Sequence, residues 1–338
     1  MAENIEHNLI QLLSGTHFDE STSELCDFTL EEQNAAAEAQ GVQPSASSNF
    51  LPVLGRTVTY IVACVIINEH DEVLMMQEAK ESCAGTWYLP AGRMEKDEQI
   101  VDAAVREVFE ETGLNIEVKS LLAVECAGGS WFRFVMTGTV LNGELKTPAR
   151  ADKESLQAKW ISNMNELSLR SKDILPLIDL GKQFKHRGQT NQVWHGNILP
   201  ARKSHTKNYL RLVAVIKKRC TNRAHVLVSE KNSYHFPTVE VHPQRSVHAT
   251  LRKFLIELFG AELPQHRPQG ILSVEHCPSE NGQNDGICMT VLVAFRPALE
   301  DVSLLGKCIW QELSKEIDER LIAVVSGKNS TLPLHVVR

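Results

Sequence analysis

Three glutamates at positions 107, 110 and 111 are the residues whose types and spacing first suggest chemistry. Side chains three and four residues apart lie on one face of a helix, so these carboxylates are predicted to form a single acidic stripe. Three like charges this close destabilise an isolated helix, and a bound divalent cation would remove that cost. Mg²⁺ prefers oxygen ligands of this kind, together with substrate phosphates. A solvated acidic face is the alternative that the helix alone leaves open.

The segment around these glutamates has the signals of a helix that follows a close-packed loop. We expect Asp97 to be the N-cap, Thr112 the last helical residue and Gly113 the C-terminal stop. The helix is predicted to dock on a sheet through an apolar stripe of Val101, Ala104, Val105 and Val108. Gly92 has no Cβ, so the loop backbone there can pass close to whatever the carboxylates hold.

Together these positions form one long pattern, Gly92-x5-Glu98-x7-Arg106-Glu107-x2-Glu110-Glu111-x-Gly113. The pattern resembles the Nudix box, and every defined position of the box is occupied. A pattern with so many fixed positions is very specific. The resemblance implies a Nudix fold over residues 52–185, an α/β/α sandwich built on a mixed sheet, and a hydrolase of nucleoside diphosphate derivatives.

The resemblance also implies a role for each position. Glu107, Glu110 and Glu111 would bind Mg²⁺, with Mn²⁺ as a substitute, and the carbonyl of Ala91 would complete the site. Arg106 would orient Glu107, while Glu98 would brace the loop against the helix. Glu107 or Glu154 would take a proton from the water that attacks phosphorus. Asp152 is a second candidate outside the box, and an exposed loop carboxylate is the alternative for Glu154. The implied substrate contacts are Trp87, Leu89 and Arg93.

Several further segments bear on the substrate. Within the family, the resemblance is strongest to vertebrate members that act on 8-oxo-guanosine diphosphates; it is carried by residues 78–80, 85–95, 130–135, 152–158 and 285–288. It implies hydrolysis of oxidised purine nucleoside diphosphates, such as 8-oxo-dGDP, to the monophosphate and phosphate. Such an activity would cleanse the nucleotide pool and prevent DNA damage. Another diphosphate derivative such as ADP-ribose is one alternative. A nucleotide-binding or sensing protein without catalysis is the other.

The order of predicted elements appears twice along the chain. Strands are expected at Val58–Ile67, Val73–Gln77, Val118–Glu125, Trp131–Val140 and Ala158–Ile161, with helices at 97–112 and 166–185. A second set follows the same order, with strands near 209–217, 224–230, 271–275 and 287–295 and a helix at 249–259. We therefore predict a second, degenerate Nudix-like α/β domain. Chance similarity between two α/β domains is the alternative.

The second set has lost most of the chemistry in a residue-by-residue comparison. Arg252 aligns with Arg106, but Lys253 stands opposite Glu107 and Ile256 opposite Glu110. Only Glu257 remains, opposite Glu111, and Val239 replaces Gly92. The predicted organisation is an acidic, flexible tail and linker at 1–51, a catalytic domain at 52–185, a linker at 186–204 and the degenerate domain at 205–338.

Composition narrows the class of partner and the compartment. The net charge of -7 argues against a nucleic-acid polymer as ligand, and a small-molecule nucleotide stays compatible. Eight cysteines without a C-x-x-C pair are typical of reduced thiols in the cytoplasm. No Lys or Arg precedes Arg56, which argues against a secretory or mitochondrial leader. We expect no membrane span, because no apolar run is long enough.

Overall fold

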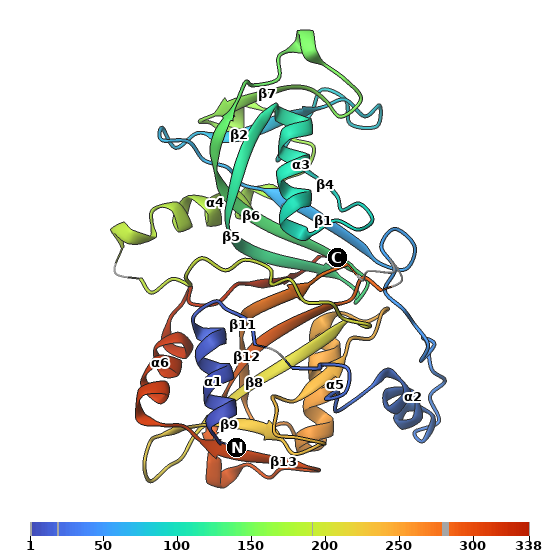
Figure 1. The fold of residues 1–338 in the computed structure, drawn as a ribbon, viewed down its shortest axis with the longest axis vertical. Coiled ribbons are helices and arrows are strands. Elements are labelled where there is room, and N and C mark those ends of the chain that lie inside the picture. The colour runs from blue at the N-terminus through green and yellow to red at the C-terminus, as the bar shows by residue number, and fades with distance from the viewer. Residues whose placement is uncertain (1, 19, 191, 279–283, 338) are drawn as a thin grey trace.

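The computed structural model describes residues 2–18, 20–190, 192–278 and 284–337, which form two α/β units stacked end to end (Figure 1). The first unit contains β1 (Thr59–Cys64), β2 (Val73–Glu78), β3 (Trp87–Tyr88), β4 (Ala91–Arg93), α3 (Ile100–Thr112), β5 (Leu114–Ala127), β6 (Trp131–Gly143), β7 (Ser155–Ile161) and α4 (Ile174–Lys185). The second contains β8 (Tyr209–Lys217), β9 (Ala224–Ser229), β10 (Thr238–Glu240), α5 (Val247–Phe259), β11 (His266–His276), β12 (Ile287–Ala298), β13 (Cys308–Glu312) and α6 (Lys315–Ser326). The helices α1 (Ala2–Leu13) and α2 (Leu30–Glu38) and the strand β14 (Leu334–Val336) lie outside both sets.

The two units have the same strand pairings. In the first, β5 pairs antiparallel with β6, β6 parallel with β1, and β1 antiparallel with β4. In the second, β11, β12, β8 and β10 repeat this order and these directions. The outer pair β2–β7 corresponds to β9–β13, and both pairs are antiparallel. The mixed sheets and their helices confirm the predicted α/β class, and the shared pairings are those expected for two copies of one fold.

The two units also share a hydrophobic core. One cluster of buried side chains contains Tyr60 and Phe132 from the first unit together with Leu210 and Ile271 from the second. The Tyr60 hydroxyl donates to the carbonyl of Asp285 at 2.6 Å. Side chains of the two units are therefore in contact across the boundary, and each unit buries apolar surface of the other.

The N-terminal segment differs from the flexible tail expected for residues 1–51. Ile5, Leu9 and Leu12 are buried in a cluster with Ile317 and Leu321 of α6. Their spacing gives α1 an apolar stripe that faces this cluster. Farther along, α2 begins with a complete capping box between Thr29 and Glu32. The N-terminal segment is thus ordered despite its acidic composition, because its apolar side chains pack against the second sheet and α6.

The expected linker and the expected second domain differ from the structure as well. The segment 186–204, expected to be a linker, hydrogen-bonds to both units: Leu121 N–H donates to the Ile198 carbonyl, and Ala201 N–H donates to that of Val274. The last strand, β14, leaves the second unit and pairs parallel with β5 of the first. The C-terminus accordingly lies at the boundary between the units in Figure 1. Residues 205–338 are therefore not confined to one unit.

The boundaries of the carboxylate helix were predicted to within a turn. Its N-cap is Gln99, not Asp97, which has a positive φ of 62° in the preceding loop. Gly113 ends the helix in the left-handed conformation expected of it, with φ 78°.

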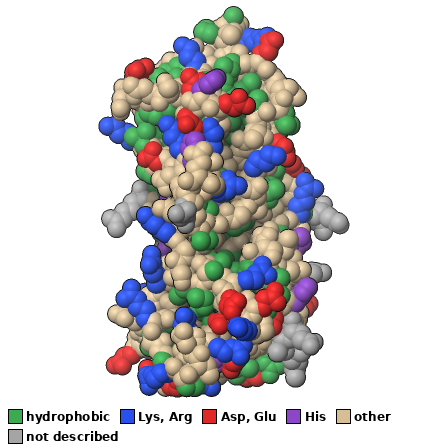
Figure 2. Space-filling view, turned by 90° about the vertical axis from the view of Figure 1, so that its left-hand side faces the viewer, with side chains coloured by type: hydrophobic (Ala, Val, Ile, Leu, Met, Phe, Trp, Pro, Cys, Tyr) green, Lys and Arg blue, Asp and Glu red, His purple; other side chains and the backbone are tan. Residues whose placement is uncertain are grey.

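The charged side chains are mixed on one face of the surface, and the described helices are too short or too polar to cross a membrane. Figure 2 shows a waist between the two units and interspersed basic and acidic side chains on the face in view, without a continuous basic patch. No helix among the described residues is long and apolar enough to cross a membrane.

The packing of α1 predicts that this helix stabilises the protein. Leu9→Ala is expected to lower the free energy of unfolding by about 2–5 kcal/mol, because Leu9 is completely buried and its loss leaves a cavity. Chemical denaturation measures this change. His7→Ala, on the exposed face of the same helix, should cost less than about 0.5 kcal/mol. Equal stability of the two variants would mean that α1 does not pack as described.

Candidate active site

The loop around Gly92 and the helix α3 meet at the predicted carboxylates. β4 is held beside β1 by the pairs Val62↔Gly92 and Ala63↔Ala91. A Cβ added at Gly92 would lie 2.1 Å from the carboxylate of Glu107, so only glycine permits this approach. Ala91 N–H donates to Glu111 Oε2 at 2.9 Å. The structure thus brings Ala91, Gly92, Glu107 and Glu111 together, as the sequence pattern predicted.

Arg106 connects the loop to the helix. Its Nε and Nη2 donate to the two oxygens of Glu98 at 2.7 and 2.8 Å, which is a bidentate pair. Its Nη1 donates to Glu107 at 2.8 Å and to Glu110 at 3.1 Å. Nη2 also reaches the carbonyl of Arg93 at 3.1 Å. This geometry matches the orienting role expected for Arg106 and the bracing role expected for Glu98.

The carboxylates of Glu107 and Glu111 are buried, and the positive charge near them does not offset the cost of burial. Glu107 is 8% exposed and Glu111 is 1% exposed. Burial raises the pKa of Glu107, and the same cause raises the pKa of Glu111 well above its usual range. Glu110, in contrast, lies exposed at the rim. Buried carboxylates persist when a cation or a hydrogen-bond donor compensates them, so this donor set fits a divalent metal.

Glu78 is a fourth carboxylate at this place that the sequence analysis did not single out. It is 1% exposed at the end of β2, and its charge contributes to the raised pKa of Glu111. Arg170 donates to its Oε1 at 2.6 Å, and its Oε2 has no hydrogen-bond partner among the described residues. The Nudix-box pattern does not include this position, and only the pairing of β2 with β7 brings Glu78 close to the helix.

Asp152 and Glu154 were the two candidate acids outside the box, and both lie just before β7. Of the two, Glu154 lines the pocket. Glu154 lines the pocket with Glu107 and Glu110, and its charge contributes to the raised pKa of Glu107. Asp152 instead pairs with Lys146 at 2.9 Å and accepts the backbone N–H of Glu154 at 3.0 Å. Asp152 therefore shapes the turn that presents Glu154.

The carboxylates open into a pocket of about 820 Å³, large enough for a nucleotide. One wall carries a polar network centred on Arg133. Its Nη1 donates to the Tyr88 hydroxyl, and its Nη2 donates to Asp173, both at 2.8 Å. Tyr88 donates to Asp173 at 2.9 Å, and Glu125 holds Arg133 from the other side at 2.5 Å. The sequence analysis assigned none of these four residues a role in the site.

Two of the three predicted substrate contacts lie elsewhere. Arg93 lines the pocket, but Trp87 and Leu89 are buried in the core between the β2 sheet and α4. Successive residues of an extended segment point to opposite faces, so Tyr88 faces the pocket and its two neighbours cannot. The structure therefore places Trp87 and Leu89 outside the lining of this pocket, and Tyr88 lies on its wall instead.

Comparisons with known proteins identify the fold and the chemistry. A family model described as "NUDIX domain" matches residues 58–176. The 8-oxo-dGDP phosphatase NUDT18 of Mus musculus is 36% identical over 304 residues, which are 86% of this chain and 91% of that protein. The chain belongs to the Nudix hydrolase family. As a Nudix hydrolase it acts on small-molecule nucleotide substrates, and the family generally needs a divalent metal.

Other Nudix relatives match a smaller share of the chain. An ADP-ribose pyrophosphatase of Methanocaldococcus jannaschii is 31% identical over 32% of this chain and 67% of its own length. The crystal structure of an ADP-ribose pyrophosphatase from Streptococcus suis covers 38% of this chain and 91% of that one, at 22% identity and a TM-score of 0.32.

The second unit of this Nudix hydrolase requires a correction to the expected alignment. α3 and α5 both have 13 residues, the same pattern of buried positions, and a glycine cap at Gly113 or Gly260. The equivalent residues are therefore 147 positions apart, one more than the alignment above assumed. Phe254 and Leu258 then replace Glu107 and Glu111, while Glu257 corresponds to Glu110 and Lys253 to Arg106. Lys253 does not stand opposite Glu107, because the burial pattern fixes the register of the helix.

The N-terminal segment covers the equivalent site in the second unit. Phe28 forms a β-bridge with Val239, which corresponds to Gly92, and its ring stacks on Phe254 at 6.4 Å between centroids. Asp27 accepts the Thr238 N–H at 2.7 Å. Lys253 donates to the carbonyl of Gln33 at 3.0 Å. Apolar and backbone contacts thus occupy the position that carboxylates hold in the first unit.

One cluster of three potential metal ligands occurs among the described residues of the second unit, namely His205, Glu275 and Cys288. Arg211 donates to Glu275 Oε1 at 2.6 Å, and His205 Nε2 lies 3.0 Å from Oε2. The guanidinium already supplies the positive charge that this buried carboxylate needs, so the cluster is an ion pair within the core.

The close approach at Gly92 predicts a specific loss of activity. Gly92→Ala places a methyl group against the Glu107 carboxylate and should lower kcat/KM by on the order of 100-fold through displacement of that carboxylate. Circular dichroism and steady-state kinetics on the same preparations separate misfolding from misplacement. Gly188→Ala is the matched control, because nothing lies within 4 Å of its added Cβ. A fully active Gly92→Ala enzyme would contradict the geometry described.

Proposed function

We propose that the protein hydrolyses oxidised purine nucleoside diphosphates, 8-oxo-dGDP and 8-oxo-GDP above all, to the monophosphate and phosphate. The observation that carries this proposal is the similarity to the mouse 8-oxo-dGDP phosphatase, which extends over both units and not only the Nudix box. The ADP-ribose pyrophosphatase of M. jannaschii matches a third of the chain and carries the alternative substrate. A purely binding or sensing role is disfavoured, because every carboxylate of the box is present.

The polar wall of the pocket suits an oxidised purine. Oxidation at C8 adds a carbonyl acceptor and turns N7 into an N–H donor. Asp173 offers a carboxylate acceptor on this wall, and the guanidinium of Arg133 offers N–H donors. Complementary hydrogen bonds of this kind discriminate strongly, because the wrong base leaves buried polar groups unpaired.

The residues at the carboxylate end fit Mg²⁺, with Mn²⁺ as a substitute. Glu107, Glu110, Glu111 and the Ala91 carbonyl would hold the ion, and the unpaired oxygen of Glu78 adds acceptor capacity beside them. When bound, a divalent ion supplies neutralisation of phosphate charge and a more acidic water. The hydrogen bond from Arg106 Nη1 orients the Glu107 carboxylate toward Gly92.

Glu154 is the proton acceptor that we favour. Glu107 is engaged by Arg106 and lies against the Gly92 backbone, whereas the Glu154 carboxylate faces the pocket and lies 3.3 Å from Lys153 Nζ. Glu154 would take a proton from water as the water oxygen bonds to phosphorus. The bond between phosphorus and the bridging oxygen breaks, and that electron pair stays on the leaving phosphate group.

The second unit is proposed to be catalytically silent. Phe254 and Leu258 cannot ligate a metal, and the segment around Phe28 occupies the space in front of them. Its role would be architectural, since it shares a core with the catalytic unit. We further propose a cytoplasmic location and a task in cleansing the nucleotide pool; the eight free cysteines agree with a reducing compartment.

The proposed substrate is tested by a comparison of nucleotides. With Mg²⁺, 8-oxo-dGDP should be hydrolysed with a higher kcat/KM than dGDP, 8-oxo-dGTP and ADP-ribose, because the polar wall pairs with the oxidised edge. Products are separated by chromatography, since cleavage of ADP-ribose releases no free phosphate. A clear preference for ADP-ribose or for triphosphates would replace the proposed substrate, although the hydrolase assignment would stand.

The difference between the two units is tested by one matched pair of variants. Glu110 and Glu257 are both exposed and occupy equivalent positions on α3 and α5. Glu110→Gln should lower kcat/KM by on the order of 100-fold, because it removes a metal ligand at constant size. Glu257→Gln should leave kcat/KM within about twofold. An active Glu110→Gln enzyme would refute the ligand assignment, and a strong loss from Glu257→Gln would refute the silence of the second unit.

A further inference from the structure

The pocket that contains the carboxylates has a wall built by the end of the chain. Val337 lines the same pocket as Glu107 and Trp131. It follows β14, which forms the edge of the first sheet in the order β14-β5-β6-β1-β4. The hydrogen bond from Val337 N–H to the Cys126 carbonyl, at 2.9 Å, continues the pairing of β14 with β5. A residue that belongs to the second unit by sequence is thus part of the active-site pocket of the first.

The sheet register places Val337 and Trp131 on one face. Val336 is paired with Cys126, and Trp131 with Ala127. Residues in register share a face, and successive residues of a strand alternate between faces. Val337, one position beyond Val336 and beside Ala127, therefore faces the same side as Trp131. Val336 faces the opposite side.

This wall lies far along the pocket from the metal-binding loop. Ala91 is in register with Ala63 of β1, whereas Trp131 is in register with Thr59. Four residues along a strand correspond to about 13 Å. An indole and a valine at that distance form an apolar end, and a planar base packs well against such side chains.

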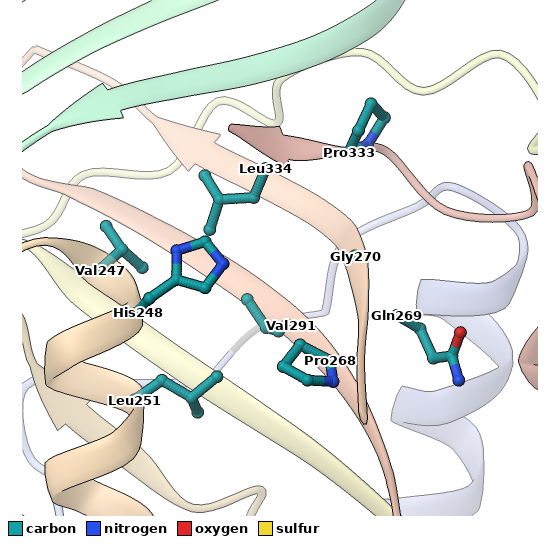
Figure 3. Close-up of a pocket in the computed structure, with 9 residues that line it drawn as sticks. All are labelled: Val247, His248, Leu251, Pro268, Gln269, Gly270, Val291, Pro333 and Leu334. Atoms are coloured by element: carbon teal, nitrogen blue, oxygen red, sulfur yellow. The ribbon is translucent and has the colours of Figure 1, made fainter. Parts of the chain in front are cut away.

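The second unit holds this wall in place. Ile271 and Leu332 exchange two backbone hydrogen bonds, at 2.8 and 2.9 Å. A Cβ on Gly270 would lie 2.5 Å from the Leu332 carbonyl, so glycine permits the crossing. Figure 3 shows Pro333 and Leu334 just beyond it, over a pocket of about 180 Å³ that α5 and β11 help to line. Leu334, His335 and Val336 already pair with β5.

We propose that the C-terminal strand completes the nucleotide pocket and that Val337 forms the apolar wall, with Trp131, that receives the base. This inference rests on the proposed function, because it assigns the base end of the same substrate. It gives the second unit a part in substrate binding, through a strand anchored on Ile271. Val337 touches substrate but takes no part in bond breaking.

The test uses the same substitution on the two faces of one strand, in the full-length protein. Val337→Asp places a carboxylate in the wall and should raise the KM for 8-oxo-dGDP by about tenfold or more, with kcat changed less than about twofold. Val336→Asp, on the other face, should leave both constants within about twofold. Hydrogen exchange of residues 334–337 reports whether β14 stays paired in each variant.

Three results would overturn the proposal. An unchanged KM in Val337→Asp means that the wall does not contact the base. An equal rise in both variants, with exchange protection lost, means that the side chain of Val337 has no specific role. A fall in kcat alone places Val337 in the chemistry instead of binding. If wild type does not hydrolyse 8-oxo-dGDP, the proposed substrate fails by itself, and the KM comparison is made with the nucleotide that wild type cleaves best.

Discussion

The contact between the Gly92 backbone and the Glu107 carboxylate is the constraint on which the active site depends. A buried carboxylate this close to a loop is tolerable only if the loop lacks a Cβ and a cation lies nearby. The bidentate pair of Arg106 with Glu98 fixes both partners, and the hydrogen bond from Ala91 to Glu111 closes the other side. The first sheet makes this contact possible because it holds β4 beside β1, where α3 packs against both strands.

The second unit shows the same framework without that constraint. With Phe254 and Leu258 on its helix, nothing requires a glycine in the neighbouring loop, and Val239 stands there. An apolar helix face opposite an open loop would expose hydrophobic surface, and the N-terminal segment covers it through Phe28. Apolar residues at the positions equivalent to Glu107 and Glu111 thus provide the surface on which Phe28 of the N-terminal segment packs.

Both chain ends cross between elements that lie far apart in sequence. The N-terminal segment packs on the second unit, and the C-terminal strand extends the sheet of the first. One core cluster contains side chains of both units, and the C-terminal strand forms the edge of the first sheet. The first unit therefore depends on the second for part of its core and for one edge of its sheet.

The sequence by itself determined the elements and the chemistry of the box, because helical periodicity and the fixed spacing of Gly92, Arg106 and the glutamates are local properties. The tertiary structure decided which side chains share the pocket. Tyr88 replaced Trp87 and Leu89 because strand pairing sets which face points inward. Glu78, Asp173 and Val337 reached the site through pairings and packing between distant segments, and no local pattern encodes them. The equivalence of Phe254 with Glu107 likewise follows from the ends and the burial pattern of the two helices. An alignment by residue type alone was in error by one position.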